Sequence, residues 1–224
     1  MPRPQAVLFD VDGTLVDTVD LHAQAWLDIF RQFGLDATFD EIRRQIGKGG
    51  DQLLPGLVPP EFLADRQEEM EKARAELFTR DYMPRVKPFP KVRELFERIR
   101  GDGLKIALAT SGKPDEVAHH KELLNIGDLL DAETTSDEAE RSKPFPDIFQ
   151  AAFRKLGLAD PSLAMVVGDT PYDTEAARAA GNPSLGVLSG GFTEASLRAA
   201  GAVAVYRDPA HLLECYDESP LAMA

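Results

Sequence analysis

The sequence has very little cysteine, since Cys215 is the single one among 224 residues. One cysteine cannot form a disulfide within the chain, which favours a reducing compartment. Long apolar runs are missing too: no stretch approaches the length of a membrane span, and residues 1–5 are too few and too polar for a signal peptide. The sequence therefore predicts a cytoplasmic protein that does not cross a membrane.

Positive charge is also scarce, because 25 Lys and Arg residues stand against 38 Asp and Glu residues and the formal net charge is −13. Nucleic acids and anionic membranes are bound by basic surfaces, so this balance argues against both as partners. A small phosphorylated substrate stays compatible with it, since one lysine and a metal ion can make a local positive pocket. The oligomeric state is left open.

Internal repeats and low-complexity segments are absent from the sequence as well. Apolar runs typical of buried strands alternate with helical spacing from residue 88 onward. Such alternation produces a parallel sheet covered on both faces, so we expect an α/β fold with a doubly wound parallel sheet. The expected strands are 6–9, 104–109, 130–134, 164–168, 184–188 and 203–205, and the expected helices are 92–100, 115–124, 147–156, 171–180 and 194–200.

The segment between the first strand and residue 88 has a purely helical pattern, with helices predicted at 21–33, 40–46, 51–57 and 61–82. No strand is expected between residues 18 and 83. The first strand must then share a domain with the second half of the chain. We expect a core domain made of residues 1–17 and 88–216, a helical domain inserted at 18–87, and a loose tail at 217–224.

Three carboxylates, Asp10, Asp12 and Asp17, follow the first strand within eight residues. Like charges at close range repel and raise each other's pKa, so a cation is expected beside them. A simple turn at Asp12-Gly13 is the alternative. For Asp17 a structural role, as a cap of the following helix or within the hinge, is favoured.

Polar residues also follow two later strands. Thr110 and Ser111 come directly after one, and Asp169 comes after another, with Asp173 four residues further on. Lys143 stands before a proline at the start of an expected helix. If the strands are parallel neighbours, their carboxyl ends share the edge of the sheet at which open α/β folds bind ligands. These side chains are therefore expected to converge on one cleft.

In this order and at these strand ends, the segments resemble the four motifs of the haloacid dehalogenase superfamily of phosphotransferases. Four motifs in order are far more specific than one short pattern, and the resemblance spans nearly the whole chain. It implies a Rossmann-like core with a small α-helical cap at 18–87, similar to the branch of β-phosphoglucomutase and phosphoglycolate phosphatase. The matching residues are Asp10 to Asp17 (DVDGTLVD), Thr110-Ser111, Lys143, and Gly168-Asp169 with Asp173.

The resemblance also implies catalytic roles. Asp10 would be the nucleophile that forms an aspartyl phosphate, and Asp12 would protonate the departing alkoxide and later activate water. Thr110 or Ser111 would donate to phosphoryl oxygens, and Lys143 would neutralise both the phosphate and Asp10. Taken alone, a serine after a strand is more often a helix cap, and a lysine before a proline is a solvated loop residue.

The cation that the resemblance implies is Mg²⁺, because the candidate ligands are all oxygens. Asp10 and Asp169 would bind the ion directly, and the backbone carbonyl of Asp12 would be another ligand. Asp173 would bind the ion either directly or through a group that itself contacts the ion. The alternative for Asp173 is structural. Thr170 and the proline after it look like a helix cap and a first-turn proline, so an acid in that turn could simply favour the helix dipole.

The helical insert carries three candidate substrate contacts, Lys48 and Gly49 in the glycine-rich run 47–50 and His22 on the first helix. Glycines allow close backbone approach, as in a loop that points into an active site, and the alternative is a plain connection with a solvated lysine. His22, one turn before Trp26, resembles the pattern of β-phosphoglucomutase and its phosphatase relatives. Its alternative is a packing or surface residue.

The function that these patterns favour is a Mg²⁺-dependent phosphatase acting on a small phosphorylated metabolite, such as a sugar phosphate or phosphoglycolate. A β-phosphoglucomutase-type isomerase is the alternative, weakened because residues 49–52 (GGDQ) replace the phosphate-binding arginine of the mutase cap loop. Asp12 argues against a dehalogenase, whose branch lacks this acid, and against a phosphonate hydrolase with Lys48 as a Schiff-base lysine. A noncatalytic binding module is disfavoured, since a decayed site would seldom keep every catalytic residue type.

Overall fold

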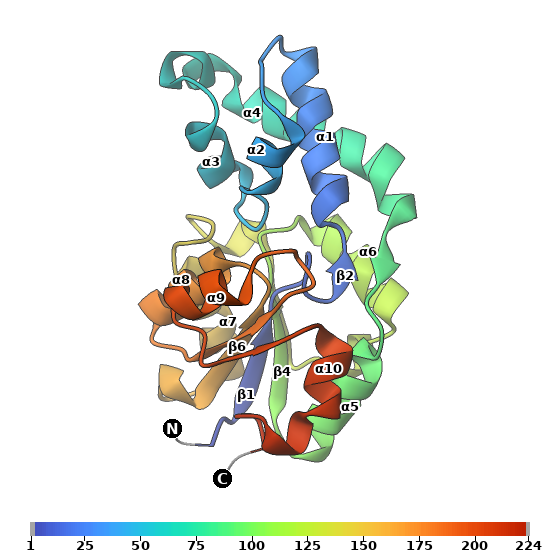
Figure 1. Cartoon of the computed structure of the whole chain (residues 1–224), viewed down its shortest axis with the longest axis vertical. Helices are drawn as coiled ribbons and strands as arrows, with labels where there is room; N and C mark the ends of the chain where they lie inside the picture. The colour runs from blue at the N-terminus through green and yellow to red at the C-terminus, as the bar shows by residue number, and fades with distance from the viewer. Residues whose placement is uncertain (1–2, 223–224) are drawn as a thin grey trace.

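A six-stranded parallel sheet lies at the centre of the computed structural model, which describes residues 3–222 (Figure 1). The strand order reverses beside β1, because the chain fills one side with β4 and β5 and the other with β6, β7 and β8. This is the predicted doubly wound α/β fold, and such a reversal opens a crevice at the carboxyl ends of the strands. In spatial order the strands are β5 (Ala132–Thr134), β4 (Lys105–Ala109), β1 (Ala6–Phe9), β6 (Ala164–Gly168), β7 (Ser184–Val187) and β8 (Ala204–Tyr206).

Helices cover both faces of the sheet because its central strands are apolar on both sides. Alternate residues of β1 point to opposite faces. Val7 and Phe9 join one apolar cluster with residues of α5, α6 and α10, while Ala6 and Leu8 join another with residues of α7 and α8. The sheet and the helices on its two faces are called the sheet layer below. These helices are α5 (Val92–Gly101), α6 (Pro114–Leu124), α7 (Asp147–Leu156), α8 (Pro171–Ala180), α9 (Glu194–Ala200) and α10 (Pro209–Glu214).

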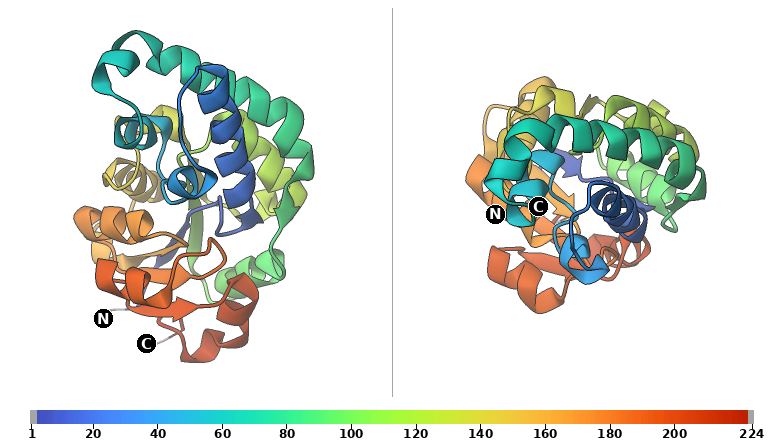
Figure 2. Two further views of the ribbon diagram at one scale, coloured as in Figure 1. Left: turned by 45° about the horizontal axis from the view of Figure 1, so that its top comes forward. Right: turned by 90° about the horizontal axis from the view of Figure 1, so that it is seen from above.

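A separate helical layer lies over the carboxyl edge of the sheet (Figures 1 and 2). It has an apolar cluster of its own, with Trp26 and Phe30 of α1 packed among residues of the neighbouring helices. Two short antiparallel strands connect it to the sheet layer. The elements are α1 (Val19–Gln32), α2 (Phe39–Arg43), α3 (Gly50–Leu53) and α4 (Pro60–Leu77), and the connecting strands are β2 (Val16–Asp17) and β3 (Lys87–Pro88).

Three of the predicted helices in this layer are too long. The helix predicted at 40–46 ends at Arg43, and Gly47, with φ of 106°, lies in the turn that follows. The helix predicted at 51–57 is one turn of α3 followed by a 3₁₀ turn, Leu54–Gly56. The helix predicted at 61–82 leaves α-helical geometry after Leu77, where Phe78–Tyr82 forms a π-helical turn.

The prediction of a loose tail at 217–224 is wrong for residues 217–222. A 3₁₀ turn, Tyr216–Glu218, follows the unpredicted helix α10, and Ser219 and Leu221 are buried against the sheet layer. Helix α10 has six residues, too few for a periodic apolar pattern, and begins where the Asp208 side chain accepts a hydrogen bond from the His211 amide. The remaining two residues of the predicted tail lie outside the described residues. Within the described chain, every helix is too short or too polar to cross a membrane.

Candidate active site

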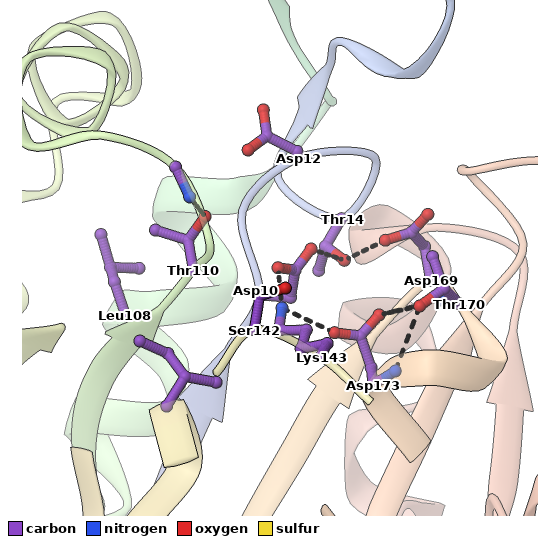
Figure 3. Close-up of polar contacts among 12 residues, drawn as sticks. Asp10, Asp12, Thr14, Leu108, Thr110, Ser142, Lys143, Asp169, Thr170 and Asp173 are labelled. Carbon is purple, nitrogen blue, oxygen red and sulfur yellow. Dashed lines mark hydrogen bonds and ion pairs between the residues drawn. The ribbon is translucent and has the colours of Figure 1, made fainter. Parts of the chain in front are cut away.

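Three buried carboxylates meet at the strand ends (Figure 3). Asp10 follows β1, Asp169 follows β6 and Asp173 lies in the first turn of α8, and one oxygen of each lies within 4.8 Å of the others. The Thr14 hydroxyl is within hydrogen-bond distance of Asp10 Oδ2, at 3.1 Å, and of Asp169 Oδ1, at 3.0 Å. Parallel pairing of β1 with β6 thus brings together acids that are 159 positions apart in the sequence.

Lys143 is the cation that faces this cluster. Its Nζ contacts Asp10 Oδ1 and lies 2.7 Å from Asp173 Oδ1, and its side chain is buried. Burial lowers the pKa of Lys143, but the two carboxylates outweigh burial and raise that pKa above its ordinary value. One ammonium therefore faces three carboxylates, and the cluster carries an excess of negative charge.

The pKa values of the acids reflect this excess of negative charge. Burial raises the pKa of Asp10 from 3.8 to about 7, because Lys143 offsets only part of the desolvation and the neighbouring Asp173 and Asp12 add to it. Burial and the Asp10 carboxylate likewise raise the pKa of Asp169 well above its ordinary value. Buried carboxylates of this kind are stabilised by a bound cation.

The surroundings of Asp169 fit such a cation. Its Oδ2 atom is buried and has no hydrogen-bond partner among the described residues. Glycines keep carbon away from this oxygen, since a Cβ on Gly190 would lie 1.6 Å from it and a Cβ on Gly13 would lie 2.5 Å from it. An all-oxygen donor set suits a hard divalent cation.

Asp173 forms the helix cap that its sequence position suggested and also faces the carboxylate cluster. Its Oδ2 atom accepts hydrogen bonds from the Thr170 amide, at 3.0 Å, and the Thr170 hydroxyl, at 2.6 Å, in a capping box at the start of α8. Its Oδ1 atom faces Lys143 and the cluster. The helix cap therefore fixes the orientation of the carboxylate that faces the other acids.

Asp12 points away from the carboxylate cluster (Figure 3). Its Oδ1 atom accepts a hydrogen bond from the Thr18 hydroxyl at 2.7 Å and lies 2.9 Å from His22 Nε2. Burial would raise the pKa of Asp12, but the charge and hydrogen bond of His22 hold that pKa well below its ordinary value. His22 is buried and stacks on Phe78, with ring centroids 4.1 Å apart, so Asp12 is held by a side chain from the helical layer.

Thr110 and Ser111 differ in their availability. The Thr110 hydroxyl accepts a hydrogen bond from the Gly112 amide at 2.9 Å and is buried, so it shapes the turn before α6. The Ser111 hydroxyl has no partner within the described part of the chain, and Ser111 lines the same cavity as Asp10 and Asp12. Thr110 lines this cavity too and uses its hydroxyl only as an acceptor in the contact with Gly112, so either hydroxyl can donate into the cavity.

The glycine-rich run 47–50 lies directly against the loops of the sheet layer. The Gly49 amide donates to Ser142 Oγ at 2.9 Å, next to Lys143, and a Cβ on Gly49 would come within 2.7 Å of the Ser142 side chain. A Cβ on Gly47 would come within 2.6 Å of Thr170. At Gly47 and Gly49 the backbone of the run therefore comes too close to the sheet layer to leave room for a side chain.

Two site residues, Arg74 and Glu116, were missed from the sequence. Arg74 of α4 donates to Glu116 of α6 at 2.9 Å, contacts His22 Nδ1, and lies 4.7 Å from the centre of the Phe78 ring. Both residues belong to helices with many charged positions, and the pattern marks neither as special. A solvated helix face and a buried ion pair look alike in a sequence.

A cavity of about 100 Å³ lies between the helical layer and the strand ends. Ten of the residues that line this cavity matter for the chemistry, four from the sheet layer and six from the helical layer. They are Asp10, Asp12, Ser111 and Glu116 from the first, and His22, Trp26, Lys48, Gly49, Glu71 and Arg74 from the second. The side chains for which the sequence suggested chemistry thus line one cavity or lie directly behind it.

A doubly wound sheet with clustered aspartates and a lysine at the strand ends, under a helical layer, is the architecture of a phosphotransferase or hydrolase of the kind the motifs resemble. Residues 7–187 match the family model described as haloacid dehalogenase-like hydrolase. The chain belongs to this family and is a hydrolase of its phosphatase type.

Several known proteins are similar over most of their length. A phosphorylated carbohydrates phosphatase of Thermotoga maritima is 30% identical over 215 residues, covering 96% of this chain and 99% of that protein. A phosphoglycolate phosphatase of Aquifex aeolicus is 29% identical, covering 83% of this chain and 85% of that one. The crystal structure of a hydrolase from Pseudomonas syringae is 32% identical with a TM-score of 0.83, covering 96% and 98% of the two chains.

Proposed function

We propose that this protein is a Mg²⁺-dependent phosphatase that hydrolyses a small phosphate monoester, of the sugar phosphate or phosphoglycolate type, through an aspartyl phosphate on Asp10. The observation that carries the proposal is the position of Asp10. It lies on the wall of the cavity between the two layers, with Lys143 and the Asp169 cluster behind it and Asp12 on the same wall.

The nucleophile in the proposed reaction is a carboxylate oxygen of Asp10. It attacks phosphorus in line with the leaving oxygen, and the bond from phosphorus to that oxygen breaks as Asp12 donates a proton to the departing alkoxide. Lys143 and the hydroxyl of Thr110 or Ser111 balance negative charge on the phosphoryl oxygens. A Mg²⁺ ion would be bound by Asp10, Asp169 and the backbone carbonyl of Asp12. Asp173 would bind the ion directly or through a group that contacts the ion. The ion would supply further positive charge next to the phosphoryl group.

The second step returns Asp10 to its starting state. Water attacks phosphorus, Asp12 accepts a proton from it, and the bond between phosphorus and the Asp10 oxygen breaks to release inorganic phosphate. The second step requires the basic form of Asp12, which its lowered pKa favours, whereas the first step requires the protonated form, which the charge of His22 disfavours. His22 and Thr18 hold the carboxylate on the cavity side throughout.

The helical layer has the position of a cap. We assign residues 18–87 to a cap domain, and residues 1–17 and 88–216 to the core domain, because residues of the helical layer form an apolar cluster of their own. Where the chain passes back toward the core, Phe78 and Val86 join the apolar cluster of the sheet layer. The cap excludes water from the phosphoryl group and supplies the wall that meets the leaving group.

The test measures phosphate release from an aryl phosphate such as p-nitrophenyl phosphate, with Mg²⁺ and with a chelator. Activity is expected only with the metal and is expected to vanish in Asp10→Asn, which keeps the shape of the side chain but removes the nucleophile. Asp36→Asn, a change at an exposed acid away from the cavity lining, is the matched control and should leave turnover intact. Full turnover by Asp10→Asn would exclude the aspartyl phosphate.

A second candidate is a β-phosphoglucomutase-type isomerase, which would pass the phosphoryl group to another sugar hydroxyl. The pattern around His22 is compatible with it, since it resembles that of β-phosphoglucomutase and its phosphatase relatives alike, while the run 49–52 without arginine speaks for hydrolysis. Chromatography of the products from a sugar monophosphate, with a parallel assay of free phosphate, separates the two.

A further inference from the structure

The segment 44–48 of the helical layer lies against the first turn of α8 in the sheet layer. At one end of the segment, the Tyr172 hydroxyl donates to the Arg44 carbonyl at 2.7 Å. At the other end, the Lys48 ammonium lies over the Tyr172 ring, with Nζ 4.5 Å from the ring centre. One aromatic side chain of the sheet layer therefore contacts both ends of this segment.

Tyr172 is itself held firmly by its neighbours. It is the second residue of α8, between Pro171 at the first helical position and Asp173, whose side chain completes the capping box. Its ring packs edge-on against Phe192, with centroids 6.0 Å apart and an interplanar angle of 81°. The ring that Lys48 meets thus belongs to the same turn that directs a carboxylate to the cluster.

Lys48 differs from the other cations on the cavity wall, Arg74 and Lys113, which pair with carboxylates. Its recorded contacts are a hydrogen bond to Gln45 Oε1 at 2.6 Å and the face of the Tyr172 ring. An ammonium has three N–H donors, so within the described chain these contacts leave one donor for an oxygen atom in the cavity.

Order in the Lys48 side chain matters for binding. A free lysine has many rotamers, and immobilising such a side chain when a ligand binds lowers affinity. The Tyr172 ring and Gln45 restrict Lys48 before any ligand arrives, and the hydrogen bond to Arg44 restricts the backbone that carries it. Tyr172 is not among the residues that line the cavity, so its effect on a ligand must pass through Lys48.

We infer that Tyr172 is a positioning residue for substrate recognition, which fixes the segment 44–48 so that Lys48 donates to an oxygen of the leaving group. Recognition of the leaving group then depends on a contact between the two layers. This inference rests on the proposed phosphatase function and deepens it.

The kinetic experiment compares glycerol 1-phosphate with propyl phosphate, which has the same carbon chain but no hydroxyl groups. With Mg²⁺, the wild-type enzyme should have a kcat/KM at least ~10-fold higher for the glycerol ester, because a charged donor meets its oxygens. Tyr172→Leu should lower this preference to ~3-fold or less, Tyr172→Phe, which keeps the ring, should lower it by a smaller factor, and Lys48→Met should abolish it. A merely structural fault would lower kcat/KM for both esters alike.

A double variant shows whether Tyr172 acts through Lys48. In the Lys48→Met background, Tyr172→Leu should change the preference no further. Arg178→Leu, at an exposed position of the same helix, is the matched control and should keep the wild-type preference. A wild-type enzyme without preference, an unchanged preference in Tyr172→Leu, or additive effects in the double variant would overturn the inference.

Hydrogen exchange without substrate tests the positioning role independently of activity. The amides of Gln45, Ile46 and Lys48 are hydrogen-bonded within the segment and the turn before it. Their exchange should be ~10-fold faster in Tyr172→Leu, while exchange in α1 stays as in the wild type, and equal rates in both proteins would overturn the inference. Absence of Mg²⁺-dependent hydrolysis of p-nitrophenyl phosphate would instead refute the proposed function itself.

Discussion

The carboxylate cluster makes the stability of the metal-free protein depend on pH. Folding raises the pKa of Asp10 from 3.8 to about 7, so the folded state binds a proton more tightly than the unfolded chain between these values. Stability therefore falls as the pH rises through this window, by at most about 4 kcal/mol for a shift of about three units. A divalent cation that binds the ionised cluster should restore this stability at high pH.

The size of the metal effect follows from linkage. At pH 8 and a Mg²⁺ concentration about 100 times Kd, binding adds about 2.7 kcal/mol, which raises Tm by roughly 5–10 °C in a chain of this length. At pH 5 the metal must displace a proton from a group with a pKa of about 7, which weakens its apparent affinity by about 100-fold. The same Mg²⁺ concentration should then raise Tm by only about 1–2 °C.

Differential scanning calorimetry at the two pH values, with and without Mg²⁺, measures these shifts. Asp169→Asn is the decisive variant, because it removes a buried carboxylate whose own pKa is raised. Without metal at pH 8 it should be more stable than the wild type, and it should lose the response to Mg²⁺. A shift of the same size at both pH values, or a full response in Asp169→Asn, would refute the assignment of the cluster as a metal site.

Three further substitutions test other parts of the site. Asp12→Asn cannot exchange a proton, so kcat in a phosphate-release assay should fall by roughly 10²–10⁴ while the Mg²⁺-induced Tm shift persists; unchanged turnover would remove Asp12 from the chemistry. His22→Ala removes the partner that lowers the pKa of Asp12, so that pKa rises and the acidic limb of the pH profile of kcat should move to higher pH; a profile superimposable on that of the wild type would contradict this role. Gly190→Ala would place a Cβ 1.6 Å from Asp169 Oδ2 and should abolish the Mg²⁺-induced Tm shift, whereas Gly127→Ala, with open space around its Cβ, should retain it.

The sequence was sufficient to predict the sheet and the groups at its edge. Apolar runs ending in Asp10 and Asp169 indicate buried strands, and parallel strands place their carboxyl ends together wherever they lie in the chain. The bounds of α7, α8, α9 and β6 were predicted to the residue, because caps, glycines and prolines bracket these elements. Convergence of these groups at the edge thus follows from a rule that acts within one layer.

The contacts between the layers could not be predicted in the same way. The pair of Arg74 and Glu116 depends on how α4 packs over α6, and nothing in the local pattern of either helix fixes that packing. For His22 the sequence left packing and function open, and the structure shows a side chain that stacks on Phe78 and also binds Asp12. Relations across an interface of two layers are set by tertiary packing rather than by periodicity.

The bare backbone of the glycine-rich run has a consequence for how this enzyme could change its substrate. Gly47 and Gly49 lie so close to Thr170 and Ser142 that a single methyl group at either glycine would push the helical layer away from the sheet layer. The glycines that allow the two layers to approach are therefore separate from Glu71 and the other side chains that line the cavity. Substitutions among the side chains that line the cavity can change which ester is accepted, while the close contact between the two layers stays the same.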